Sequence, residues 1–136
     1  MQETETQLVL RLIEEVFNGG DLELIDELVH PDFFDHEAPA SRSLGLAGLR
    51  ASVRRLHESF AGYRLEPTDV VAADGKVVVR GSASDRHVGS INGIAATGEE
   101  WSSPQFHVFR IADRRVIEHW ASREDFASLR RAEERS

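Results

Sequence analysis

The sequence has 136 residues, a formal net charge of −8 at pH 7 and no cysteine. This length fits a single domain over residues 1–136, and the lack of cysteine excludes disulfides, thiolate metal sites and cysteine nucleophiles. The acidic balance argues against binding to nucleic acid or to an anionic membrane, since both need clustered Lys and Arg. The sequence shows neither a secretory signal nor a membrane-spanning run, so we expect a cytoplasmic protein.

The first residues predict two short helices that meet at a tight corner. Apolar residues recur with helical spacing from Leu8 to Phe17, and the segment Asn18-Gly19-Gly20 is typical of a helix end. Asp21 can cap a second helix, which Pro31 should stop.

A short extended segment and a third helix follow. Residues 31–36 are expected to be extended, and residues 37–45 mix Pro, Ser, Ala and Gly without a period, which is typical of a loop. An apolar stripe from Leu46 to Phe60 predicts the third helix, which should end at Gly62.

The second half of the chain predicts an antiparallel meander. Residues 63–73 and 76–84 read as strands joined by Asp74-Gly75, a strong hairpin signal. Residues 101–111 and 115–123 form another expected pair, linked near Asp113-Arg114, and a polar helix should begin near residue 124. The order predicts an α+β fold in which three N-terminal helices pack on a curved antiparallel sheet that encloses a conical cavity.

Two segments of the sequence resemble the SnoaL-like polyketide cyclase family. In residues 85–98 a His, a Gly, a second Gly and a Thr-Gly pair occur with the family's spacing, and residues 107–120 resemble its last strand pair, which ends in Glu-His-Trp. The segments 17–21 and 31–36 are also similar. This resemblance implies a cone-shaped domain of the nuclear transport factor 2-like superfamily.

The resemblance also implies an activity. Family cyclases close a ring of an aromatic polyketide ester by intramolecular aldol condensation, with an acid/base carboxylate and neighbouring His residues and without a metal or organic cofactor. The family's catalytic aspartate is expected directly after the Trp, where this chain has Ala121. Two alternatives therefore stay open: hydroxylation of an anthracycline-type ring, and a non-catalytic module that binds a small molecule or serves assembly.

Strand alternation selects His107 as the first candidate catalytic residue. It alternates with Phe109 and Ile111, so one face of this strand carries an imidazole among apolar side chains. Phe109 would then contact the substrate. The structural alternative is a core His whose ring is satisfied by a neighbouring carbonyl.

The last predicted strand offers two opposite sets of side chains. His119 shares its face with position 121, whereas Glu118 shares its face with Trp120. The family resemblance favours His119 inside as a catalytic residue. If Trp120 faced inward instead, it would contact the substrate, and burial would raise the pKa of Glu118, which suits an acid/base.

Further candidates carry weaker arguments. Asp35 and His36 follow an apolar pair at the expected cone opening, where they would bind substrate or else form an exposed turn. Asp125 could replace the missing aspartate or merely cap a helix. Three more substrate-binding candidates, each with a structural alternative, are Tyr63, His87 and Trp101.

The remaining site classes find no support in the sequence. No His-Glu-x-x-His or comparable cluster suggests a metal, and no Gly-x-Ser-x-Gly elbow suggests a serine nucleophile. We expect no cofactor and an apolar or aromatic small-molecule substrate. The resemblance implies a homodimer through the outer sheet face, where Phe106, Val108 and Trp120 could form an apolar patch.

Overall fold

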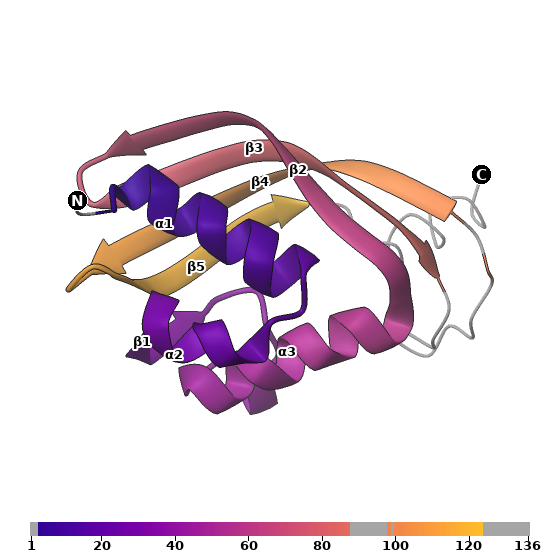
Figure 1. Cartoon of the computed structure of the whole chain (residues 1–136), viewed down its shortest axis with the longest axis horizontal. Helices are drawn as coiled ribbons and strands as arrows, with labels where there is room; N and C mark the ends of the chain where they lie inside the picture. The colour runs from indigo at the N-terminus through magenta and orange to yellow at the C-terminus, as the bar shows by residue number, and fades with distance from the viewer. Residues whose placement is uncertain (1–2, 88–97, 99, 124–136) are drawn as a thin grey trace.

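In the computed structural model, helices lie across one face of a curved five-stranded sheet (Figure 1). The structure describes residues 3–87, 98 and 100–123, except for the side chains at 86, 87, 101 and 123. The helical elements are α1 (Glu5–Arg11), η1 (Leu12–Asn18), η2 (Leu22–Leu24), α2 (Ile25–Leu28), η3 (Ala40–Arg42) and α3 (Gly45–Ser59). The strands are β1 (Val29–Asp35), β2 (Phe60–Ala73), β3 (Lys76–His87), β4 (Glu100–Ala112) and β5 (Arg115–Arg123).

The N-terminal helix is longer than predicted and changes its winding midway. Thr4 caps α1, because its hydroxyl accepts from the Gln7 N–H at 3.1 Å while the Gln7 side chain accepts from the Thr4 N–H at 2.9 Å. After Arg11 the chain continues as the π-helical segment η1. The Asn18 amide then bonds the backbone N–H and C=O of Leu65 at 2.8 and 3.0 Å, which fixes the helix end to β2.

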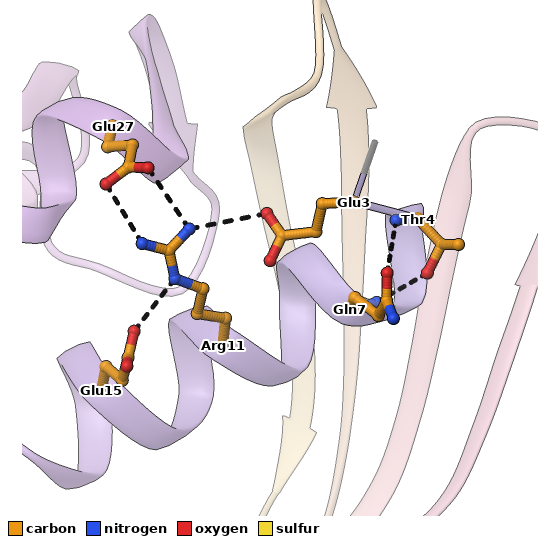
Figure 2. A network of polar contacts seen from close by, with 6 residues as sticks. All are labelled: Glu3, Thr4, Gln7, Arg11, Glu15 and Glu27. Atoms are coloured by element: carbon orange, nitrogen blue, oxygen red, sulfur yellow. Dashed lines mark hydrogen bonds and ion pairs between the residues drawn. The ribbon is translucent and has the colours of Figure 1, made fainter. Parts of the chain in front are cut away.

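Arg11 joins the first two helices (Figure 2). Its guanidinium donates to Glu15 one turn on and to Glu27 of α2, both at 3.1 Å, and it also pairs with Glu3 at 3.7 Å. The hydrogen bond to Glu27 is the largest cause of the raised pKa of Arg11. These partly exposed contacts orient α1 and α2, although each one adds little stability by itself.

The short strand β1 corrects two details of the prediction. The second helix ends at Leu28, and Pro31 lies inside β1 instead of at the helix end; an edge strand tolerates proline because one side of its backbone is unpaired. In addition, β1 pairs in parallel with β5, so the sheet is not wholly antiparallel. The chain can pair these strands in parallel because α3 carries it from β1 to β2 at the opposite edge of the sheet, and the meander then brings β5 back beside β1.

The four long strands form the predicted antiparallel meander, in the sheet order β1-β5-β4-β3-β2. Both predicted hairpins are confirmed. Asp74 and Gly75 have φ of 53° and 72°, and Asp113 and Arg114 have φ of 52° and 61°, as a two-residue hairpin turn of this hand requires. The predicted C-terminal helix and most of the segment 85–98 lie outside the described residues.

The core fills the space between the helices and the concave side of the sheet. Its fully buried side chains come from both layers, including Leu12, Ile25 and Leu49 from the helices and Val77 and Phe109 from the strands. In the part of the chain that the structure describes, no helix is long and apolar enough to cross a membrane.

Candidate active site

The helix-covered face of β4 is unusually polar for a core strand. Side chains alternate along the strand, and the buried set comprises Ser103, Gln105, His107 and Phe109. Ser102, Pro104 and Phe106 point to the opposite face and are exposed. The structure therefore places His107, 5% exposed, on the inner face beside Phe109, as the alternation predicted.

The register between β4 and β5 decides which side of the last strand faces inward. Phe109 pairs with His119, and His107 pairs with Ala121. His119 is 5% exposed on the same inner face. Glu118 and Trp120 consequently point outward, so the alternative in which Glu118 is the buried inner carboxylate is wrong.

Four buried side chains on this face form one continuous chain of hydrogen bonds. Asp35 Oδ1 lies 2.8 Å from His119 Nδ1, and His119 Nε2 lies 2.8 Å from His107 Nδ1. His107 Nε2 lies 2.8 Å from Gln105 Oε1. The two imidazole planes are nearly parallel, with ring centroids 5.1 Å apart, and Phe109 packs against His119 at 4.9 Å.

Strand pairing and a tight turn hold the Asp35 carboxylate in place. Asp35 is the last residue of β1 and lies opposite His119 in the parallel register. Its backbone N–H donates to the Ser43 carbonyl at 2.7 Å, and its Oδ1 accepts from the Glu37 N–H at 2.9 Å. The carboxylate thus reaches His119 already oriented by the backbone.

The number of N–H protons that these hydrogen bonds need shows what the cluster can do chemically. Its three hydrogen bonds run between two acceptors, the Asp35 carboxylate and the Gln105 carbonyl oxygen, and therefore need three N–H protons. Two neutral imidazoles carry two N–H groups, so this arrangement suits one additional proton balanced by Asp35. If the Gln105 amide turns so that its N–H donates to His107, two neutral imidazoles supply the remaining two donors, and all three hydrogen bonds are still made. The cluster can therefore hold or release a proton and keep its connectivity.

A second histidine–carboxylate pair lies on the outer face, directly behind the first. His36 Nε2 lies 2.8 Å from Glu118 Oε2, and the His36 ring stacks on Trp120 with centroids 4.6 Å apart. Arg110 also donates to Glu118. The hydrogen bond from His36, followed by the interactions with Arg110, lowers the pKa of Glu118, which is the opposite of the raised pKa expected for a buried acid.

The predicted site residues therefore fall into separate groups. Asp35, His107 and His119 come together with Phe109 on the inner face, whereas His36, Glu118 and Trp120 lie on the outer face. Tyr63 is half-buried and packs against the core cluster. Asp125 and the side chains of His87 and Trp101 lie outside what the structure describes.

Sequence reasoning did not select Gln105, Ser103 or Asp85. All three are buried polar residues on the inner face, and the first two share strand parity with His107, a signal that could have revealed them. Within the described ranges, no group of three or more His, Asp or Glu residues is arranged to hold a metal ion.

Comparison with known proteins identifies the family of this chain. The model of the SnoaL-like polyketide cyclase family matches residues 7–132. The chain belongs to this family. The aklanonic acid methyl ester cyclase of Streptomyces peucetius is 29% identical over 121 residues, which are 85% of this chain and 81% of the relative. The nogalonic acid methyl ester cyclase of Streptomyces nogalater is 30% identical over 110 residues, which are 76% and 78% of the two chains.

The fold agrees with the family assignment. The solved structure of TsrD from Streptomyces laurentii superposes with a TM-score of 0.80 and 32% identity, covering 95% of this chain and 96% of that one. The nuclear transport factor 2-like architecture expected from the sequence is thereby confirmed, and the curated relatives are polyketide cyclases.

Proposed function

We propose that this protein catalyses the cofactor-independent, acid/base cyclisation of an aromatic polyketide ester. One observation carries the proposal: a buried carboxylate, two imidazoles and an amide form one hydrogen-bonded chain on the helix-covered face of the sheet. The names of both curated relatives, which are cyclases of methyl esters, support the substrate class.

The proposed reaction is an intramolecular aldol addition. A base removes a proton from the carbon next to a carbonyl group, and the resulting enolate attacks a second carbonyl carbon of the same molecule. One C–H bond breaks, one C–C bond forms, and the new alkoxide takes up a proton. The substrate and product are isomers, so the reaction requires no oxidant, reductant or leaving group.

His107 is the residue best placed to move the proton in this scheme. Its Nδ1 is engaged by His119, which Asp35 holds, whereas its Nε2 contacts an uncharged amide that a substrate can displace. We assign proton transfer to Nε2 and a positioning and charge-balancing role to His119 and Asp35. Burial strengthens each of these electrostatic interactions relative to water.

Ala121 supports the assignment of the proton transfer to an imidazole. The register places Ala121 directly opposite His107, so an aspartate at this position would lie beside the imidazole. Here only a methyl group occupies that place. The nearest carboxylate in the described chain of hydrogen bonds is Asp35, which acts through His119 and not on the substrate.

The test is turnover of an anthraquinone-type polyketide methyl ester by the purified protein, analysed by mass spectrometry. Cyclisation gives a product of unchanged mass. A product that has gained one oxygen atom would instead support the hydroxylase alternative, and binding without turnover would support the non-catalytic module. A reaction in D₂O adds a direct probe, since proton abstraction at carbon should incorporate deuterium into recovered substrate or product.

We also propose that the outer sheet face joins two copies of the chain. A register-aligned row of Val71, Val78, Val108 and Trp120 crosses four strands on this face, and Phe106 is 48% exposed beside it. An apolar row of this extent favours a protein partner. Light scattering should give the dimer mass for the natural chain and the monomer mass for Phe106→Asp; an unchanged mass would contradict this interface.

A further inference from the structure

A second polar region lies on the inner face of β4, beyond the hydrogen-bonded cluster. Ser103 is two residues from Gln105 and four from His107, on the same face of the strand. Because a strand rises about 3.4 Å per residue, Ser103 and His107 lie about 14 Å apart along β4. The cluster of His107 and this serine thus mark two ends of one buried face.

The Ser103 hydroxyl has no hydrogen-bond partner within the part of the chain that the structure describes. The residue is 3% exposed, and its Oγ makes no hydrogen bond there. Its cross-strand neighbour on β3 is Ala83, which offers only a methyl group. Buried hydroxyls in proteins are nearly always hydrogen-bonded, so a hydroxyl left in this state points to a partner that arrives with a ligand.

A carboxylate shares the face with this serine. Asp85 is 7% exposed and follows Ala83 by two residues on β3, so it points to the same side of the sheet. The register pairs Ala83 with Ser103, which makes Asp85 a diagonal neighbour of Ser103 across the two strands. The two side chains combine a hydrogen-bond donor with a strong acceptor.

We propose that Ser103 and Asp85 form a specificity subsite for a phenolic hydroxyl at the end of the substrate remote from the reacting carbon. A phenol is both donor and acceptor, so it can donate to the Asp85 carboxylate and accept from the Ser103 hydroxyl. The separation from His107 suits a polycyclic aromatic molecule that lies along β4. The assignment rests on the proposed function for the substrate class, and neither residue takes part in the proton transfer.

The experiment compares the binding of two ligands that differ by one remote hydroxyl. Dissociation constants of 2-hydroxyanthraquinone and of anthraquinone, which lacks the hydroxyl, are measured by fluorescence quenching with the natural chain, Ser103→Ala, Asp85→Asn and Ser102→Ala. Ser102 is the matched control, because it is the neighbouring serine on the exposed face of β4. Thermal unfolding of each variant is followed in parallel.

We expect the natural chain and Ser102→Ala to prefer the hydroxylated ligand by about tenfold to a hundredfold, the range expected for a hydrogen bond to a carboxylate. Ser103→Ala and Asp85→Asn should each lower this ratio, because each variant removes or weakens one of the two hydrogen bonds to the phenol. Ser103→Ala should leave the melting temperature unchanged or higher, since it removes a hydroxyl without a protein partner.

Four outcomes would overturn the subsite. Equal affinities for both ligands in the natural chain would overturn the subsite alone, and so would an unchanged preference in Ser103→Ala. A marked loss of stability in Ser103→Ala would assign the hydroxyl a structural role. Failure to bind either quinone would overturn the proposed aromatic substrate class together with the subsite.

Discussion

Two histidine–carboxylate pairs lie back to back where β1 meets β5. Asp35 and His119 form the inner pair, and His36 and Glu118 form the outer one, each with an N to O distance of 2.8 Å. The side chains of the inner pair are 12% and 7% exposed, whereas those of the outer pair are 34% and 22% exposed. The two pairs thus have the same contact distance but differ strongly in their exposure to solvent.

The difference teaches that connectivity and burial, not the contact itself, separate a catalytic candidate from a surface ion pair. His119 is also hydrogen-bonded to His107, so a change of charge on His107 alters the interaction between His119 and Asp35. His36 instead stacks on Trp120, and Glu118 shares its second oxygen with Arg110, which leaves the outer pair electrostatically satisfied. Water screens interactions there and weakens them.

The largest expected effect is that of His107→Ala, which should nearly abolish turnover of an aromatic polyketide ester. A positioned acid/base contributes about a hundredfold to ten-thousandfold to the rate, so kcat should fall by that factor. The matched control is His36→Ala on the outer face, which should keep turnover within about threefold, a change below that range. We also expect a much smaller effect from Asp125→Asn than from His107→Ala.

Thermal unfolding must accompany these assays, because a buried His can also be structural. If His107→Ala remains folded and nearly fully active, imidazole catalysis at this position is wrong. If Asp125→Asn is instead the inactive variant, the family's missing carboxylate is replaced further along the chain.

An intermediate effect is expected for Asp35→Asn. The amide oxygen can still accept the His119 N–H, but the charge that balances a protonated imidazole pair is lost, and charge-assisted hydrogen bonds are roughly twice as strong as neutral ones. We expect kcat to fall about tenfold, the equivalent of about 1.4 kcal/mol, with a comparable loss in the free energy of unfolding. Steady-state kinetics over a pH series and urea unfolding provide the measurements.

Glu118→Gln is the outer counterpart of that substitution and should leave kcat within about twofold, far below the effect of a lost acid/base. Equal losses of activity in the two variants would contradict the separation of the inner and outer pairs. A loss of stability without any loss of kcat in Asp35→Asn would reduce the inner carboxylate to a structural role.

The sequence predicted most of the fold because its signals are local. The turn residues Asp74-Gly75 and the alternation around His107 determined the hairpins and the inward face of β4 without knowledge of the tertiary structure. The parallel pairing of β1 was not predictable in this way, since it depends on a contact between residues more than eighty positions apart, such as Asp35 and His119. The inner pair of Asp35 and His119 could not be predicted for the same reason, because the two residues meet only through this long-range contact.

The candidate site was predicted less completely for the same reason. Both inner imidazoles were selected by parity and by the family resemblance, but Gln105 was overlooked because an amide carries no charge and matches no motif. His36 was misplaced because a one-residue step along an extended strand moves a side chain to the opposite face of the sheet. Asp35 and His36 are adjacent in sequence and lie on opposite sides.

The smallest expected effect concerns the outer pair and its dependence on pH. The pKa of Glu118 lies below its ordinary value of 4.5, chiefly because of the hydrogen bond from His36 and then because of Arg110. A carboxyl whose pKa is lowered by folding stabilises the folded state above its unfolded pKa, and this contribution disappears as the pH falls through the lowered folded value. The natural chain should therefore be more stable than Glu118→Gln at pH 6 and equally stable at pH 3.

The difference at pH 6 should be about 1 kcal/mol or less, because the pair is partly exposed, and it should shrink further in high salt. Thermal unfolding of both proteins at the two pH values and at two salt concentrations measures it. A difference that persists at pH 3 would mean that the glutamine disturbs packing against Trp120 instead of removing a charge. A large, salt-independent difference would mean that Glu118 contributes to stability as strongly as Asp35 does. The two pairs would then differ only in that the inner pair is hydrogen-bonded onward to His107.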